Sequence, residues 1–330
     1  MASTAQLEVD PTLLIDSEYG SEISGYDTST QSLASSVNQY ILENGRRYHA
    51  YYGENKNMLP SDEIEQDRLD MLHEMFLLLL DRKLHMAPVE NPQRILDMGT
   101  GTGIWAIDAA NEYPEAEVVG VDLSPIQPTW VPPNCRFEVD DLEKEWTYKP
   151  NHFDFIFARC IAQAITDWPA VMKQAYRCTK PGGTIELWET GGILYSDDNS
   201  MKPDNETKIF YEHIAEAMAK TGRPAHIEGS NLVEYLENAG FVDVVVNKVK
   251  LPHGPWAKEK RLKQAGTMAL IAFDTGFHSY GMAAFTRILG MSNEEADKLC
   301  YGGLNAVRNR ANHTYTYLHI VYGRKPEESK

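Results

Sequence analysis

Short apolar segments of strand length alternate with longer segments of helical periodicity from about residue 94 onward. The helical segments are residues 103–113 and 167–178. The strand-like segments are residues 94–98, 117–122, 135–139, 153–158 and 184–188. Because apolar strands that alternate with helices form right-handed β–α–β units, we expect a doubly wound α/β fold whose parallel sheet is covered on both faces.

The segment before this sheet is predicted to be mostly helical. Residues 1–35 are polar and lack periodicity, which favours a flexible segment. Residues 36–52 place Tyr and Ile side chains near one helical face. A second helix is expected from the N-cap pair Ser61-Asp62 to about residue 85, with a buried stripe formed by Leu69, Leu72, Phe76, Leu79 and Leu80. The predicted organisation is therefore a flexible segment (1–35), an N-terminal helical cap (36–90) and a main domain (91–330).

The C-terminal part of the chain extends the sheet around an insertion. Helices are predicted at residues 204–221 and 231–238, and strands at residues 241–249 and 314–322. The insert between these strands, about residues 251–310, is predicted to hold helices at 256–273, 280–289 and 292–310. Its aromatic and Met residues suit the wall of a substrate pocket, but a core or a homodimer face is the favoured interpretation.

Charge and composition narrow the range of functions. Lys and Arg total 31 and Asp and Glu total 48, and the resulting net charge of −17 argues against a nucleic-acid partner. We expect no membrane association, because residues 1–10 lack a signal pattern and the apolar run at residues 75–80 is far too short to span a bilayer. Four cysteines without a CxxC pair predict neither a metal site nor disulfides. The expected compartment is the cytoplasm, and the basic residues 258–263 leave the nucleus open.

A glycine-rich loop follows the first predicted strand of the sheet. The strand ends in Asp97, and Gly99, Thr100, Gly101 and Gly103 come next, before a predicted helix. Such a turn needs positive φ angles and points a helix N-terminus at a ligand. A dinucleotide or S-adenosylmethionine fits a loop of this kind, but the glycines follow a GxGxG pattern instead of GxGxxG, and no Gly-Lys-Ser or Gly-Lys-Thr follows.

Acidic residues end the next two predicted strands. Asp122 lies about twenty residues beyond the loop, where a carboxylate binds the two hydroxyls of a ribose. Asp140 and Asp141 end the third strand, and one of them is expected to accept a hydrogen bond from the amino group of adenine. The predicted cofactor site also includes the residues that follow these acids, Leu123 and Leu142.

The loop and the acids together resemble the class I S-adenosylmethionine-dependent methyltransferases over about residues 90–190. The resemblance implies S-adenosyl-L-methionine as cofactor and a seven-stranded Rossmann-like sheet whose last strand is antiparallel. Residues 241–249 and 314–322 would then be the sixth and seventh strands, with the helical insert between them.

A closer resemblance, to the fungal LaeA-like methyltransferases, covers nearly the whole chain from about residue 37. It rests on residues 40–49, 97–107 and 122–135, on Asp167-Trp168-Pro169, and on the terminal Tyr322-Gly323-Arg324-Lys325-Pro326. Members of that family act in, or regulate, fungal secondary metabolism, some of them with velvet-domain partners. The chain departs from the family pattern near the fourth strand. There Phe157-Ala158-Arg159 keeps the usual Arg without the usual His, and Ala162-Gln163-Ala164 replaces a Gly-Ser pair.

The remaining candidate residues lie outside the loop and the acids. Arg159 is included in the cofactor site on this resemblance. Arg47, or its neighbour Arg46, could pair with the methionine carboxylate, and Tyr48 could face the sulfonium. Glu189, His49 and His226 are candidate bases, and the sequence assigns the catalytic base to none of them.

Three functions stay open at this point. The first is a methyltransferase that acts on a small molecule of fungal secondary metabolism. The second is a LaeA-like regulatory subunit that works through velvet-type partners. The third is a cofactor-binding protein of this fold that catalyses a step other than methylation.

Overall fold

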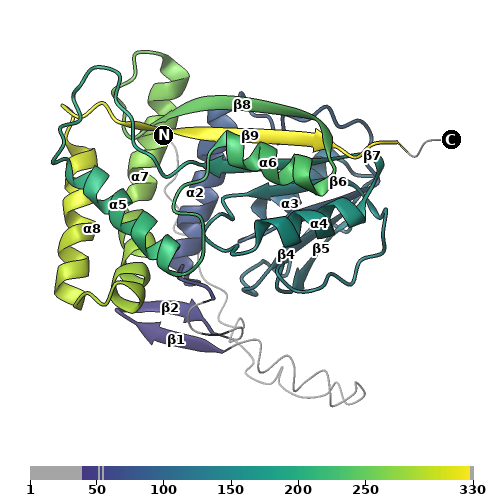
Figure 1. Cartoon of the computed structure of the whole chain (residues 1–330), viewed down its shortest axis with the longest axis horizontal. Helices are drawn as coiled ribbons and strands as arrows, with labels where there is room; N and C mark the ends of the chain where they lie inside the picture. Colours follow the sequence, from purple (N-terminus) through teal and green to yellow (C-terminus); the bar gives the residue numbers. More distant parts are fainter. Residues whose placement is uncertain (1–38, 51–52, 54–55, 328–330) are drawn as a thin grey trace, which may run out of the picture. The chain divides into compact units, whose positions relative to one another are not determined.

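The computed structural model describes residues 39–50, 53 and 56–327, and the predicted flexible segment at residues 1–35 lies outside this range. A seven-stranded sheet runs in the order β5-β4-β3-β6-β7-β9-β8 (Figure 1). The two pairings of β9 are antiparallel and all other neighbours pair in parallel, as the sequence predicts. The strands are β3 (Arg94–Met98), β4 (Glu117–Asp122), β5 (Cys135–Val139), β6 (Phe153–Arg159), β7 (Thr179–Thr190), β8 (Val242–Pro252) and β9 (Tyr315–Arg324).

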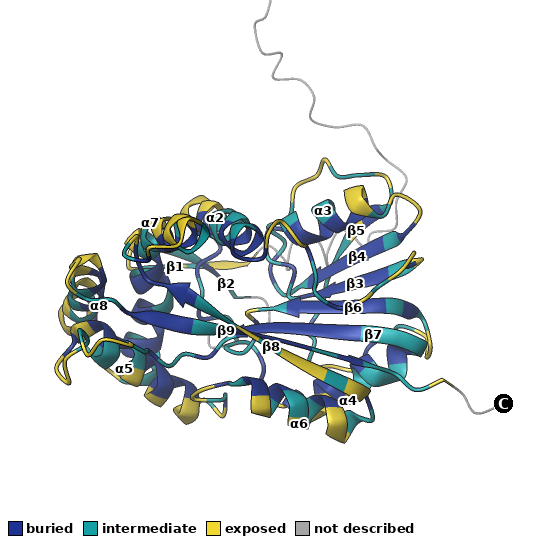
Figure 2. Cartoon of the chain, turned by 90° about the horizontal axis from the view of Figure 1, so that it is seen from above, coloured by how far each residue is buried: buried dark blue, intermediate teal, exposed yellow. Residues whose placement is uncertain are grey.

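Helices cover both faces of this sheet (Figure 2). On one face, α2 (Glu63–Leu79), α3 (Ile104–Glu112) and the start of α7 (Lys260–Ala283) enclose a core that contains Trp105 and Phe155. On the other face, α4 (Trp168–Cys178) and α6 (Gly229–Ala239) pack over Ile156 and Leu187. Strands such as β4 and β6 are apolar on both faces because both faces are buried, which explains their continuous apolar runs.

A group of helices beyond the strand ends has a core of its own. It comprises α5 (Glu206–Lys220), α7, the short π-helix η1 (Ala284–Ile288) and α8 (Asn293–Arg308), packed around Phe210, Phe277 and Phe285. The insert between β8 and β9 is helical, but the separate helices expected at 256–273 and 280–289 form one continuous helix. Gly276 lies inside it and costs about 1 kcal/mol relative to Ala. Packing of α7 along α2 outweighs that cost.

The helix predicted at residues 36–52 is wrong, because the described part of this segment is a β-hairpin. Strands β1 (Tyr40–Glu43) and β2 (Arg46–His49) pair across Asn44 and Gly45. The φ angles of these two residues are 51° and 72°, which is the geometry that an Asn-Gly turn supplies most easily. The N-terminal cap is therefore a hairpin followed by the single helix α2. This helix begins after Asp62 and ends at Leu79, short of the predicted residue 85.

None of the helices within residues 39–327 that the structure describes combines the length and the apolar character needed to cross a membrane.

Candidate functional site

The glycine loop between β3 and α3 has the backbone geometry that its sequence predicts. Gly99, Gly101 and Gly103 have φ angles of 69°, 58° and 83°. A Cβ atom at Gly99 would collide with the side chain of Ile161, and one at Gly103 would collide with the ring of Phe137. The loop therefore needs glycine both for its left-handed backbone and for close packing.

The amide groups of this loop are already hydrogen-bonded within the protein. The N–H groups of Gly99 and Thr100 donate to the carbonyl of Val121 at 2.8 and 3.0 Å. The N–H of Gly101 donates to Asp122 Oδ2 at 2.9 Å, and the N–H of Gly103 donates to the Thr100 carbonyl at 2.9 Å. The loop thus offers a ligand little of the amide cradle that binds phosphates in other glycine-rich loops.

A cavity lies against this loop at the carboxyl ends of β3, β4 and β5, the edge where doubly wound sheets bind ligands. Helix α2 contributes Leu69, Leu72 and Phe76 to its wall. Ten of the predicted cofactor residues line this cofactor cavity: Asp97, Gly99, Thr100, Gly101, Asp122, Leu123, Asp140, Asp141, Leu142 and Arg159.

Two of the lining carboxylates are buried at strand ends. Asp97 is 3% exposed and accepts a hydrogen bond from Thr100 Oγ1 at 2.5 Å, and burial raises the pKa of its carboxyl to about 7. Asp122 accepts hydrogen bonds from the N–H groups of Gly101 and Ser124, both at 2.9 Å, and burial raises its pKa as well. Burial thus disfavours the ionised form of both carboxyl groups. A cation that binds in the cavity would stabilise the ionised form and be attracted to it.

Asp140 and Asp141 have different surroundings, although both line the cavity. The carboxylate of Asp141 pairs with Lys56 Nζ at 3.0 Å and accepts the N–H of Glu143. The carboxylate of Asp140 accepts one hydrogen bond within the described chain, from the N–H of Asp141 at 2.8 Å. Asp140 is therefore the one with acceptor capacity left for a ligand.

Arg159 supplies a positive charge to the same cavity. Its guanidinium lies 3.2 Å from His73 Nδ1 and 5.1 Å from the centre of the Phe76 ring. His73 is itself held by Asp108 at 3.0 Å. No carboxylate of the described residues lies within ion-pair distance of Arg159, and burial lowers its pKa. A buried guanidinium of this kind gains energy when an anion binds beside it.

Three predicted cofactor residues do not line the cavity. Gly103 caps helix α3 against Phe137. The guanidinium of Arg47 donates to the Ser61 carbonyl and to Glu63 instead. Tyr48 is buried in the helical core under the guanidinium of Arg287, and burial raises its pKa to about 12. The hairpin turns Arg47 and Tyr48 toward these partners, so we leave both out of the cofactor contacts. Arg46 likewise forms an ion pair with Asp62.

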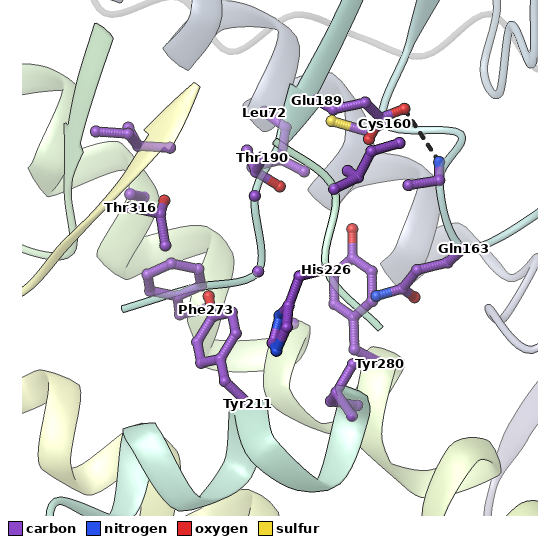
Figure 3. A pocket seen from close by; sticks show the side chains of 18 of the residues that line it. Leu72, Cys160, Gln163, Glu189, Thr190, Tyr211, His226, Phe273, Tyr280 and Thr316 are labelled. Carbon is purple, nitrogen blue, oxygen red and sulfur yellow. Dashed lines mark hydrogen bonds between the residues drawn. The ribbon is translucent and has the colours of Figure 1, made fainter. Parts of the chain in front are cut away.

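A second cavity adjoins the first and is shown in Figure 3. Leu251, Phe210, Tyr211, Phe273 and Phe277 form its apolar and aromatic wall. The helical insert thus contributes both to a core and to the wall of a pocket. Five residues line both cavities and define their junction: Leu72, Phe76, Cys160, Gln163 and Tyr280.

The three candidate bases lie in different places. Glu189 is 2% exposed and lines the second cavity, and burial raises the pKa of its carboxyl to about 8. His226 lines the same cavity from the segment before α6 (Figure 3). His49 is buried at the end of β2 and lines neither cavity.

Comparisons with known proteins identify the family of this chain. A family model described as "Methyltransferase domain" matches residues 71–246. Methyltransferase pytC of Aspergillus terreus is 38% identical over 303 residues, which cover 91% of this chain and 92% of that protein. The chain belongs to the LaeA-like methyltransferase family. Secondary metabolism regulator LAE1 of Cochliobolus heterostrophus is 34% identical over 298 residues, covering 88% of this chain and 96% of that protein. Protein-methionine methyltransferase laeA of Emericella nidulans is 33% identical over 291 residues, covering 88% and 77% respectively.

The departures of this methyltransferase from the family pattern fall on the cavities. Phe157 stacks on Trp105, with ring centres 3.9 Å apart, and both line the cofactor cavity. Gln163 lies at the junction, and Ala164 lies on the cofactor side. Phe157 and Ala164 thus shape the cofactor cavity, and Gln163 shapes its junction with the second cavity.

Sequence reasoning missed three junction residues of this methyltransferase. Cys160 has a φ angle of 56°, unusual for a residue other than glycine, and its N–H donates to the Trp188 carbonyl. Tyr280 comes from α7, more than a hundred residues away in sequence. Of these three residues, only Gln163 could have been found from the sequence, because it departs from the family pattern. Within the described ranges no group of three or more His, Cys, Asp or Glu side chains is placed to hold a metal ion.

Proposed function

We propose that this chain is an S-adenosylmethionine-dependent methyltransferase that acts on a small molecule of fungal secondary metabolism. One observation carries the proposal: an acidic cofactor cavity opens directly onto a second cavity with an apolar and aromatic wall. The comparisons support the reaction class, and the name of the pytC relative supports a methyltransferase role.

The charges of the cofactor cavity match those of the proposed cofactor. S-adenosylmethionine has a sulfonium, an ammonium and a carboxylate. We assign the ammonium to Asp97, the carboxylate to Arg159, the ribose hydroxyls to Asp122 and the adenine amine to Asp140, all of which line the cavity. When bound, this cofactor supplies an electrophilic methyl group. The residues of the chain position the acceptor and exclude water around it.

The same cavity disfavours the dinucleotide alternative. A dinucleotide has two phosphates, and these would lie beside the carboxylates of Asp97, Asp122 and Asp140. Like charges at such short range are unfavourable. The loop amides that would compensate for them already donate to Val121, Asp122 and Thr100.

A regulatory role is the second candidate, and the names of two relatives favour it. LAE1 is named as a secondary metabolism regulator, and laeA of Emericella nidulans as a protein-methionine methyltransferase. In this case the acceptor is a protein side chain, and a velvet-type partner presents it. A homodimer and a cytoplasmic or nuclear location stay predictions under both candidates.

The experiment uses radiolabelled S-adenosylmethionine and the full-length chain. Samples are incubated with a fungal metabolite extract and, separately, with a fungal protein extract. Label in small molecules is the expected result. Label in protein alone, or none together with a stable partner complex, would support the regulatory role instead.

A further inference from the structure

The carboxyl group of Glu189, at the end of β7, is held by one of its two oxygens. Oε1 accepts the N–H groups of Ile161 and Ala162 at 2.8 and 3.0 Å. The dashed line in Figure 3 shows a hydrogen bond of this carboxyl. Oε2 accepts no hydrogen bond from any described residue. The side chain is buried, and no described cation lies within ion-pair distance of it. Oε2 is therefore open to a hydrogen bond with a molecule bound in the cavity.

Glu189 lies at the wall of the second cavity, close to the junction with the cofactor cavity. Cys160, Gln163 and Tyr280 line both cavities, and Glu189 lines the second one next to Cys160 (Figure 3). A methyl group transferred between the cavities must pass at their junction. The atom that receives it therefore lies within the neighbourhood of the Glu189 carboxyl.

The wall of the second cavity selects the kind of acceptor. Phe210, Tyr211, Phe273 and Phe277 present ring faces, which favour a molecule that itself contains rings. Apart from Glu189, the acidic and basic side chains among the described residues of this wall are His226, His253 and Arg68, and the guanidinium of Arg68 forms an ion pair with Glu65. An anionic acceptor would lose its hydration here without a free counter-charge, because Arg68 is already paired. A cationic acceptor would meet only the Glu189 carboxyl, which is protonated and neutral below its raised pKa of about 8, so an uncharged acceptor fits best.

We propose that Glu189 is the catalytic base for transfer to a hydroxyl group, a phenol or an enol, on an uncharged ring-containing molecule, an inference that rests on the proposed function. The acceptor oxygen forms a bond to the methyl carbon, and the bond between methyl carbon and sulfur breaks with its electron pair going to sulfur. The hydroxyl proton goes to Glu189 Oε2. The products are a methyl ether, the neutral thioether and a protonated Glu189.

The other ionisable groups around the cavity are unsuited to this step. Burial raises the pKa values of the Tyr211 and Tyr280 hydroxyls. Partial desolvation in the cavity raises the pKa of the Cys160 thiol, although this residue is exposed at the cavity. Burial lowers the pKa of His253, just after β8, to about 3, so it is a weak base. His319, which pairs with Glu189 across β7 and β9, also has a lowered pKa.

His226 is the competing base, because it lines the same cavity. Asp97, in the cofactor cavity, is expected to lose its proton beside the ammonium of a bound cofactor and so to be ionised over the pH range of the assay. The pKa of Glu189, raised by burial to about 8, makes its ionised fraction increase as the pH rises through that value. Activity limited by this base therefore increases over the same range.

The experiment compares the full-length wild type with Glu189→Gln and His226→Gln at saturating S-adenosylmethionine. The probes are β-naphthol as the phenol, 3-hydroxyflavone as the enol and naphthylmethylamine as a charged amine of a size similar to β-naphthol. We expect methyl ethers from the hydroxyl probes, and a kcat that rises with pH to a plateau above about pH 8. Glu189→Gln should lower kcat about 10²- to 10⁴-fold and abolish this pH dependence. His226→Gln should retain it.

A second readout does not depend on turnover. Infrared difference spectra between the wild type and Glu189→Gln should show one protonated carboxyl group below about pH 8, which disappears at higher pH. The thermal midpoints of wild type and variant should agree closely, because Gln retains an oxygen for the N–H groups of Ile161 and Ala162.

Each outcome bears on a different statement. An unchanged kcat and pH profile in Glu189→Gln, or a loss of pH dependence in His226→Gln instead, would overturn the role of Glu189. Preference for the amine, or no methyl ether from either hydroxyl probe while the cofactor still binds, would overturn the acceptor class. Failure of the wild type to bind S-adenosylmethionine would instead overturn the proposed function.

Discussion

Two glycines of the loop separate cofactor binding from folding. Gly101 lines the cofactor cavity, and a Cβ atom there would lie 3.5 Å from Leu69 Cδ1, an ordinary contact. Gly103 does not line the cavity, and a Cβ atom there would overlap the ring of Phe137. Substitution of each glycine by alanine therefore tests a different part of the structure.

The expected costs follow from these surroundings. Both positions have positive φ angles, which cost alanine about 1–2 kcal/mol of unfolding free energy. The collision at Gly103 adds about 1–3 kcal/mol of overpacking, so Gly103→Ala should lose about 2–5 kcal/mol in total. Gly101→Ala should lose only the backbone cost, but its methyl group narrows the cavity against Leu69.

The assay combines denaturant unfolding with calorimetric titration of S-adenosylhomocysteine, the product form of the proposed cofactor. Gly101→Ala should weaken binding at least about tenfold, equivalent to about 1.4 kcal/mol, with a modest loss of stability. Gly103→Ala should show the larger loss of stability while its folded fraction retains most of the affinity. Wild-type affinity in Gly101→Ala, or wild-type stability in Gly103→Ala, would refute the reasoning.

Three further predictions concern single residues. Arg159→Leu should weaken S-adenosylhomocysteine binding about 10- to 100-fold in calorimetry, because a charge-assisted hydrogen bond to the carboxylate of the ligand is lost. The same substitution should not lower the unfolding free energy, since the guanidinium has no carboxylate partner in the described chain. The carboxyl of Asp97 keeps its proton up to about pH 7 in the folded state and loses it near its ordinary pKa of 3.8 when unfolded, so the free energy of unfolding without cofactor should fall as the pH rises between these values. Denaturant titrations at several pH values should show that Asp97→Asn lacks this fall. An identical fall in both proteins would contradict the assignment. Gly45→Ala should cost about 1 kcal/mol of stability with unchanged affinity, because its φ is 72° and a Cβ atom there would meet nothing within 4 Å.

Local sequence patterns predicted the part of the fold that local patterns control. The bounds of β3, β4 and β5 agree with prediction, since short apolar runs between turn residues specify buried strands. The hairpin was missed although Asn44-Gly45 is a strong turn signal, because the tyrosines around it also fit a helical face. The continuous α7 was missed because Gly276 suggests a break, whereas packing along α2 and α8 keeps the helix intact.

The candidate site also has one part that the sequence predicts and one part that it does not. The acids and glycines of the cofactor cavity lie at the ends of consecutive strands, so their spacing in sequence reports their position in space. The second cavity has no such order. Its walls come from α2, α5, α7 and β8, and tertiary packing alone brings Tyr280 beside Cys160. A conformational feature such as the positive φ of Cys160 leaves no mark in the sequence.

The most direct test of the account is calorimetric titration of S-adenosylhomocysteine and of NADH into the wild type and into Asp122→Ala. Asp122 lines the cofactor cavity and is assigned to the ribose hydroxyls. We predict saturable binding of one equivalent of S-adenosylhomocysteine to the wild type, at least about tenfold weaker binding to Asp122→Ala, and no heat with NADH. Binding of NADH, or no binding of S-adenosylhomocysteine by the folded wild type, would contradict the account.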